Sequence, residues 1–581
     1  MQIEDVLSKS REWINQLVGK ELQYITGRNT SVINRVDWDD GQIFVSRGDA
    51  QITIRFERIV AVISKLIKGH PIHVDTVLRS GSNDRTVIET IIANFPPVGF
   101  MRPNQGRNKN KNKVIQWLNE DIHDLGVIMD ISLDKFAALF ISSAEEKNAK
   151  ALSKPFLLLA GISGTGKTRF VREQAEESKE GKEDNYCLVP VRPDWHEPSD
   201  LLGYVSRLGK TPEYVATDVL RFIVQAWKEI IVKIEHDKKG EKLPIDWRGK
   251  DLSDIRTFWL CLDEMNLAPV EQYFSDYLSI LETRRWNDPQ KLEGSDRDYI
   301  YECDPLIKGE LFRSLDKDFD KDYSKKPSNL LAKDLGLDLD NNQKDKDIWN
   351  YFLQHGIAIP FNLIVAGTVN MDETTHGFSR KVIDRALSFD FGAFFPNNYN
   401  DFFTRTSSNK RLSYPIWSHA SKADLANTFD VDGTKTIAFL SAVNAVLKNT
   451  PFELAFRALN ELLLAVVSSQ SQDDLTLKAV WDDFMMCKVL PRIEGDTDKL
   501  TTADGKALLA ELNMVLAEQL APIWQAEEGD NNQRPDLYRE NVVDDGAPDE
   551  DKVLHIPCRS KAKLEWMSKR LASATFTSFW P

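Results

Sequence analysis

The chain has 581 residues and a net charge of −15, with 42% hydrophobic and 28% charged residues. This balance is typical of globular proteins, and the length predicts several domains. The acidic balance argues against a protein that coats nucleic acid over its whole surface, although it allows a local basic patch. No apolar run approaches the roughly 18 residues that a membrane span needs, and the five cysteines form no Cys-x-x-Cys pair. We therefore expect a cytoplasmic protein with reduced thiols, without a zinc site or a membrane contact.

Residues 1–100 predict a small α+β domain. Four short β-rich runs, separated by turn residues, precede two helical stretches at about 57–68 and 85–93. Residues 101–113 follow as a basic linker, because every charge in them is positive. We expect this linker to be either a solvated hinge or an arm that contacts nucleic-acid phosphates.

Residues 114–395 predict an α/β core, in which apolar runs alternate with helical stretches. We expect helix over 114–150, leading up to the first core strand, and a charged surface insertion at about 289–350. Continuous apolar runs are typical of strands buried on both faces of a parallel sheet. Four such runs are candidate strands: 155–161, 186–191, 257–264 and 362–370. Residues 396–581 are expected to form a helical lid and a C-terminal region.

A phosphate-binding loop follows the first core strand. Its sequence is GISGTGKT, and its glycines allow backbone N–H groups to converge on phosphate oxygens at the start of the following helix. In such loops the lysine neutralises the β- and γ-phosphates, and the final hydroxyl binds Mg²⁺. The candidate nucleotide-binding residues are Gly161, Ile162, Ser163, Gly164, Thr165, Gly166, Lys167 and Thr168.

Two further apolar runs end in residues suited to hydrolysis. The run FWLCLDE ends in Asp263, which could hold Mg²⁺ through its water, and Glu264, which could orient and deprotonate the attacking water. The run NLIVAGTVN ends in Asn370. This asparagine could hydrogen-bond the same water or the γ-phosphate; the alternative is an asparagine that caps a turn.

Two arginines are candidates for contacting the γ-phosphate. Arg385, in a segment that we interpret as helical, could reach the nucleotide of a neighbouring subunit. The alternative is a surface ion pair with Asp384 or Asp390. Arg457, in another predicted helix, could close over the nucleotide of its own chain. Its alternative is a salt bridge with Glu461, four residues further on.

These parts, in this order, resemble the AAA+ superfamily and, within it, the McrB-type restriction NTPases. The resemblance covers roughly residues 150–581, and beyond the phosphate-binding loop it rests on the stretches 191–207, 262–282 and 367–386. It implies an AAA+ P-loop NTPase core with a parallel sheet, a C-terminal helical lid and a small α+β N-terminal domain.

The resemblance also implies an anti-phage function. Such proteins form nucleotide-dependent rings, expected here as a hexamer, with the sites at subunit interfaces. They act with a separate McrC-like nuclease and read DNA through their N-terminal domain. Carried over to this sequence, the phosphate and Mg²⁺ ligands are Lys167 and Thr168, the Walker B pair is Asp263 and Glu264, the sensor is Asn370, and the arginine finger is Arg385.

Two points remain open at the level of sequence. After Asn370 the chain reads Met-Asp-Glu, where GTP-preferring relatives have Thr-Ala-Asp, so both ATP and GTP are candidate substrates. The same catalytic parts also suit a MoxR-like ATPase that remodels protein partners. DNA binding by residues 1–113 that weakens steeply with salt would favour the restriction hypothesis.

Overall fold

The computed structural model divides the chain into two compact units, one formed by Met1–Glu146 and one by Lys147–Asn287 with Arg297–Pro581. Each unit has its own hydrophobic core. Within the described part of the chain, no helix has the length and apolar character needed to cross a membrane. The structure describes residues 3–25, 30–48, 50–67, 74–78, 85–101, 114–118, 123–130, 149–179, 184–209, 211–236, 244–287, 299–317, 326–371, 377–401, 403–527, 529–530, 532–543 and 549–580.

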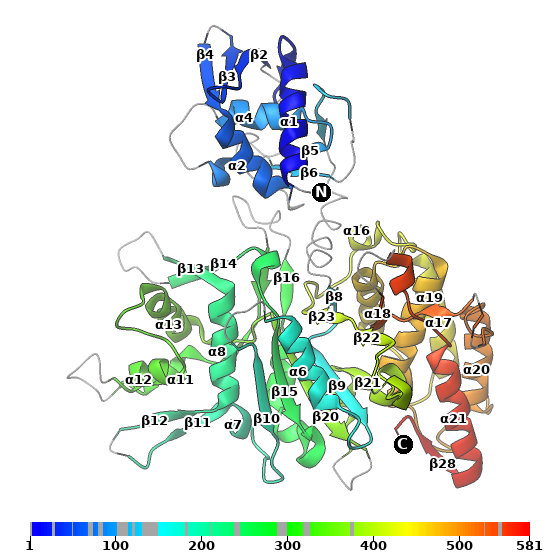
Figure 1. Cartoon of the computed structure of the whole chain (residues 1–581). Coiled ribbons are helices and arrows are strands. Elements are labelled where there is room, and N and C mark those ends of the chain that lie inside the picture. The colour runs from blue at the N-terminus through cyan, green and yellow to red at the C-terminus, as the bar shows by residue number, and fades with distance from the viewer. Residues whose placement is uncertain are drawn as a thin grey trace. The chain divides into compact units, whose positions relative to one another are not determined.

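The first unit packs helices against an antiparallel sheet (Figure 1). The sheet has the order β1–β2–β3–β4, and its strands match the four predicted β-rich runs. Alternate residues such as Ile33, Ile43 and Ile54 are buried, as expected for a sheet covered on one face. The elements are α1 (Ile3–Leu17), β1 (Glu21–Gln23), β2 (Thr30–Asp37), β3 (Gln42–Arg47), β4 (Ala50–Arg55), α2 (Phe56–Leu66), α3 (Val74–Val77) and α4 (Arg85–Ala93).

The first unit extends further along the chain than the sequence indicated. β6 (Val114–Trp117) pairs with β5 (Val98–Met101), which also pairs with β7 (Met129–Asp130). Ile115 and Trp117 are buried in the core of this unit. The prediction of helix from residue 114 is therefore wrong for β6 and β7, and residues 114–117 do not belong to the α/β core. The predicted basic linker at 102–113 lies outside the described residues.

The second unit is built on a five-stranded parallel sheet in the order β10–β15–β20–β9–β21. Every residue of β9 and β20 is buried, which agrees with their continuous apolar sequences. Four of the five strands confirm the predicted runs; β21 was not predicted. The strands are β9 (Phe156–Gly161), β10 (Tyr186–Pro190), β15 (Phe258–Asp263), β20 (Leu363–Asn370) and β21 (Leu387–Asp390).

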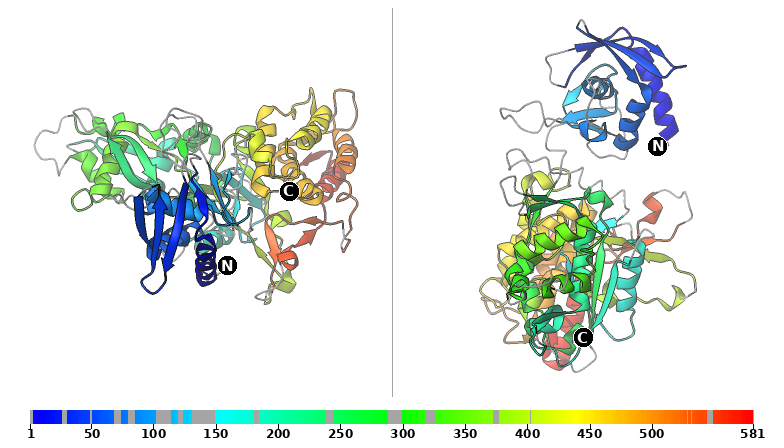
Figure 2. Two further views of the ribbon diagram at one scale, coloured as in Figure 1. Left: turned by 90° about the horizontal axis from the view of Figure 1, so that it is seen from above. Right: turned by 90° about the vertical axis from the view of Figure 1, so that its left-hand side faces the viewer.

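Helices pack on the sheet, and two hairpins that form separate two-stranded sheets lie on the side of β10 (Figures 1 and 2). α6 begins at Lys167, within the phosphate-binding loop sequence, and α8 packs against β10 and β15. Two antiparallel hairpins flank α8. These elements are α6 (Lys167–Glu177), α7 (Pro198–Leu202), β11 (Gly203–Ser206), β12 (Glu213–Ala216), α8 (Asp218–Ile230), β13 (Ile231–His236) and β14 (Pro244–Gly249).

The charged segment at 289–350 is not merely a surface insertion in its described parts. It contains α11 (Gly309–Ser314), α12 (Pro327–Asp334) and α13 (Gln343–His355). Trp349 and Phe352 of α13 are buried in the core of the second unit. The many charged residues of α13 suggested a surface segment, although its apolar residues have the spacing of one buried helix face.

On the side of β21 lies a mostly helical region, as predicted (Figures 1 and 2). Its π-helix η7 (Met485–Val489) packs against β21. Buried ion pairs join Asp482 and Asp483 of this region to Arg534 and Arg559. The longer helices are α17 (Thr434–Leu447), α18 (Phe456–Ser469), α19 (Asp474–Phe484), α20 (Leu508–Gln519) and α21 (Arg559–Ala574).

Candidate active site

The phosphate-binding loop connects the end of β9 to the start of α6. Gly164 and Gly166 have φ angles of +80° and +90°, a region that residues with a Cβ atom rarely adopt. Lys167 is buried, and its Nζ donates hydrogen bonds to the carbonyl oxygens of Gly161 (3.0 Å) and Ile162 (2.7 Å). The ammonium group of Lys167 is therefore held against the backbone of the loop. The loop lies at the N-terminus of α6, and a helix N-terminus favours the binding of an anion such as phosphate.

Asp263 lies at the end of β15 and receives two hydroxyl hydrogen bonds. Thr168 of α6 and Thr368 of β20 each donate from Oγ1 to its Oδ1 at 2.7 Å. Because β9, β15 and β20 are parallel, their carboxyl ends meet at one edge of the sheet. The sheet thus brings together the loop and the first carboxylate, as the sequence predicted.

Glu264 and Asn370 complete the cluster. The side chain of Asn370 donates to Oε1 of Glu264 at 3.3 Å, and the backbone N–H of Glu264 donates to Oγ1 of Thr368 at 2.9 Å. Glu264 has a φ of +54°, which is uncommon for a residue other than glycine. Such backbone conformations concentrate at functional sites, where the surrounding contacts enforce them. Asn370 therefore does more than cap a turn, because its amide contacts the second carboxylate.

The oxygen atoms of Thr168 and Asp263 fit the requirements of Mg²⁺. Magnesium prefers oxygen ligands and is commonly bound by one or two carboxylates together with substrate phosphates. These two residues are the protein groups that would hold it. Among the residues that the structure describes, no group of three or more His, Cys, Asp or Glu side chains is arranged to hold a metal ion.

The sequence reading missed two residues at this site. Thr368 links the carboxylate of Asp263 to the backbone N–H of Glu264, and it lies two positions before Asn370 on the same strand. The period of two along a strand was the signal that could have found it. Asn397 donates from Nδ2 to the carbonyl oxygen of Thr165 at 3.2 Å, which ties the segment after β21 to the phosphate-binding loop. No local pattern around Asn397 indicated this contact.

The two candidate arginines meet on one carboxylate, Glu282. Nε of Arg385 lies 3.2 Å from Oε1 of Glu282, and Nη2 of Arg457 lies 2.7 Å from Oε2. Within the described residues, neither arginine has a hydrogen bond or ion pair with residues 161–168 of its own chain. The helix predicted in this segment, α14 (Arg380–Ile383), ends before Arg385, which lies in the turn between α14 and β21.

The alternative ion pairs proposed from sequence are not those of the structure. Asp384 binds Lys488 and Arg492, and Asp390 binds Lys563. Glu461 binds Lys154 and Lys488 rather than Arg457. Each of these three carboxylates therefore pairs with a different cation from the one that the sequence suggested.

Known proteins match parts of this chain. Residues 417–576, in the helical region, match a family described as a domain of unknown function (DUF8727). The type II restriction enzyme NmeDI of Neisseria meningitidis serogroup C is 29% identical over 120 residues, which are 19% of this chain and 34% of that enzyme. The chain thus spans about a third of the length of this relative.

A solved structure is similar at a low level. It is described as a "putative ATPase" from Cytophaga hutchinsonii, with 11% identity, a TM-score of 0.29, and coverage of 66% of this chain and 96% of that one. The observed fold, with its five-stranded parallel sheet and phosphate-binding loop, is itself consistent with a P-loop ATPase-like architecture.

Proposed function

We propose that this chain is an AAA+ nucleoside-triphosphatase that hydrolyses ATP or GTP with Mg²⁺. The observation that carries the proposal is the set of hydrogen bonds joining Thr168 to Asp263, Asp263 to Thr368, and Glu264 to Asn370. These bonds link the phosphate-binding loop to two carboxylates from a distant part of the sequence. A purely structural loop would not require this convergence of hydroxyl, carboxylate and amide groups at one sheet edge.

The geometry supports a distinct role for each residue. Lys167 and the loop amides bind the phosphates. Thr168 and Asp263 would hold Mg²⁺, which would neutralise phosphate charge. Glu264 accepts the proton of the attacking water, and Asn370 orients the Glu264 carboxylate through its amide. Arg385 contacts the nucleotide of the neighbouring subunit in a ring, which agrees with its lack of a described contact to the loop of its own chain.

The biological setting that we propose is a McrBC-like restriction system. In it the chain is the ring-forming motor, with a separate McrC-like nuclease and with DNA bound through the N-terminal unit. The three family-like stretches support this setting, and so does the partial similarity to a type II restriction enzyme. The nucleotide base stays open between adenine and guanine, because no described contact selects one of them.

The test is hydrolysis of ATP and of GTP by the full chain, with and without DNA and the product of the neighbouring gene. We expect Mg²⁺-dependent turnover of at least one nucleotide and stimulation by DNA or the nuclease. Absence of any turnover under all these conditions would overturn the proposal. Turnover without DNA binding, together with capture of a protein client, would instead support the remodelling ATPase.

Glu264→Gln tests the assigned chemistry in the same assay. The amide keeps the shape of the side chain but cannot accept the proton, so turnover should fall by roughly 100-fold or more while nucleotide still binds. Glu213→Gln, on an exposed position of β12, is the matched control and should hydrolyse normally. Retained turnover in Glu264→Gln would show that the water-activating role is misassigned.

A further inference from the structure

Glu282 connects three separate parts of the second unit. It follows α10 (Ser275–Leu281), and its two carboxylate oxygens pair with Arg385, in the turn before β21, and with Arg457, on α18. The side chains of Glu282 and Arg385 are 34% and 16% exposed. One partly buried carboxylate therefore holds the candidate arginine finger and a helix of the helical region at the same time.

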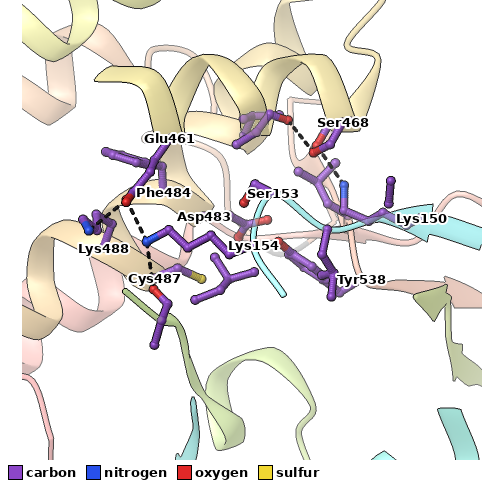
Figure 3. A pocket seen from close by; sticks show the side chains of 18 residues that line it. Lys150, Ser153, Lys154, Glu461, Ser468, Asp483, Phe484, Cys487, Lys488 and Tyr538 are labelled. Carbon is purple, nitrogen blue, oxygen red and sulfur yellow. Dashed lines mark hydrogen bonds and ion pairs between the residues drawn. The ribbon is translucent and has the colours of Figure 1, made fainter. Parts of the chain in front are cut away.

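The residue next to Arg385 is bound to the helical region as well. Lys488 of η7 donates to the carbonyl oxygen of Asp384 at 2.7 Å, and Nε of Arg492 lies 3.3 Å from its carboxylate. Lys488 also pairs with Glu461 of α18 at 2.8 Å. Figure 3 shows the side chains of Lys488 and Lys154 pointing toward Glu461. The turn at 384–386 is thus attached to the helical region through Asp384 and, by way of Glu282, through Arg385.

The guanidinium group of Arg385 is fixed at two points. Nε lies 3.2 Å from Oε1 of Glu282 in an ion pair without a hydrogen bond, and Nη1 donates to the carbonyl oxygen of Lys381 at 3.1 Å. Within the described residues, Nη2 has no hydrogen bond in the same chain. A mostly buried guanidinium needs a carboxylate partner, because an unpaired charge in that environment is costly. Loss of the Glu282 charge would therefore release the orientation of Arg385.

We propose that Glu282 is a positioning residue that aims Arg385 and couples it to the helical region of its own chain. The inference rests on the proposed function, in which Arg385 contacts the nucleotide of the next subunit. Movement of the helical region in one subunit is then passed, through Arg457 and Glu282, to the arginine that serves the neighbouring site. Glu282 itself touches no nucleotide.

The first test is Glu282→Gln, which keeps the size of the side chain and removes its charge. We expect kcat to fall by roughly 10- to 100-fold, as for a catalytic group displaced by about 1 Å, while KM changes less than about 3-fold. Glu518→Gln, at an exposed position of α20, is the control and should match the wild type. An active wild type with an unaffected Glu282→Gln variant would overturn this inference alone. An inactive wild type would overturn the proposed function, and this inference with it.

Rings assembled from subunits of two variants distinguish a loss of Arg385 positioning from a general structural effect of Glu282→Gln. Lys167→Ala subunits have an intact Glu282–Arg385 pair, so they should restore turnover to Glu282→Gln subunits, whose phosphate-binding loop is intact. Arg385→Ala subunits should not restore it, because both variants lack a positioned arginine. Recovery in neither mixture, or equal recovery in both, would overturn the inference once co-assembly is shown.

Arg457→Ala provides a second variant in case Glu282→Gln fails to fold. Arg457 is 46% exposed, and its removal leaves Glu282 paired with Arg385. We expect a smaller loss of kcat with the same pattern in mixed rings. A wild-type kcat in this variant would overturn the link between the helical region and Arg385.

Discussion

At the scale of single residues, the hydroxyl of Thr368 joins the carboxylate of Asp263 to the backbone of Glu264. It donates to Asp263 and accepts from the backbone N–H of Glu264. Thr368→Val has nearly the same shape but removes both bonds and leaves the N–H of Glu264 unpaired, which costs about 1–3 kcal/mol. We expect kcat to fall by roughly 10-fold or more, measured by steady-state hydrolysis with the better nucleotide.

Thr368→Ser is the matched control for this prediction. Serine keeps the hydroxyl and loses only a methyl group, so most of the activity should return. Equal loss in both variants would mean that packing of the methyl group, and not the two hydrogen bonds, explains the effect.

The buried amino group of Lys150 affects the free energy of unfolding and not the proposed hydrolysis. It lies before β9, donates to Oγ of Ser469 at 2.8 Å and lies over the ring of Tyr538 (Figure 3). Burial, together with the positive charge of Lys410, lowers its pKa from 10.5 to about 7. The other charged groups that act on it are Asp483, Arg534 and Asp536.

This pKa shift predicts that stability rises with pH. Between about pH 7 and 10, the unfolded chain binds a proton at Lys150 that the folded chain releases, so the free energy of unfolding increases across this window. Lys150→Met removes the titrating group and should flatten the increase, as measured by urea unfolding at several pH values. Lys154, whose pKa burial also lowers to about 7, keeps part of the dependence in both proteins. An exposed control, Lys506→Met, should leave the slope unchanged; an unchanged slope in Lys150→Met would contradict the prediction.

At the scale of elements, β20 packs closely against the turn that follows β15, and this packing positions Glu264. A Cβ atom at Gly367 would lie 2.3 Å from Sδ of Met265, in the short helix η3 (Met265–Leu267). Gly367→Ala must therefore shift the side chain of Met265, whose Cβ and Cγ would also lie 3.3 Å from the new atom, and we expect this shift to disturb the neighbouring Glu264. We expect a loss of turnover that is larger than the loss of nucleotide binding.

Met265→Ala in the same chain makes room for the added methyl group. The double variant should recover part of the turnover lost in Gly367→Ala, whereas Met265→Ala alone should be less stable than the wild type by about 2–5 kcal/mol. A double-mutant cycle in kcat and in the free energy of unfolding measures the coupling. Additive losses would show that the two residues do not act through the same contact.

The elements that the sequence revealed are those whose pattern is local. β9, β15 and β20 are continuous apolar runs, so their burial on both faces could be predicted. β21 has only four residues and follows a charged segment. Its strand conformation depends on pairing with β9, which lies more than 200 residues away in the sequence. β6 was missed for the same reason, because its pairing with β5 across residues 102–113 is what favours the strand.

The same distinction applies to the site. Residues 161–168 are consecutive, and their glycine spacing alone identifies a phosphate-binding loop. Asp263, Glu264 and Asn370 were found because each ends an apolar run, and strand ends of a parallel sheet meet at one edge. The contact of Glu282 with Arg385 joins residues that share no local pattern, and only the packed structure reveals it.

At the scale of the whole molecule, the proposed catalytic cluster and the proposed DNA-binding region belong to different units. Lys167, Asp263, Glu264 and Asn370 all lie in the second unit, which has its own core. A chain that begins at residue 147 should therefore fold and hydrolyse nucleotide. It lacks the first unit and the five basic residues between 102 and 113, so we expect it to lose DNA binding and any stimulation of hydrolysis by DNA.

Two measurements check whether hydrolysis and DNA binding belong to different units: hydrolysis with and without DNA, and DNA binding over a series of salt concentrations. For the full chain, the logarithm of the binding constant should fall linearly with the logarithm of the salt concentration, because phosphate contacts release counterions. A full-length variant with the five basic residues changed to glutamine shows whether the linker is the phosphate-contacting arm. A smaller dependence of DNA binding on salt in this variant would support that role. An unchanged dependence would favour a hinge. DNA-stimulated hydrolysis by residues 147–581 would contradict the assignment of DNA binding to the first unit and place it on the second unit instead.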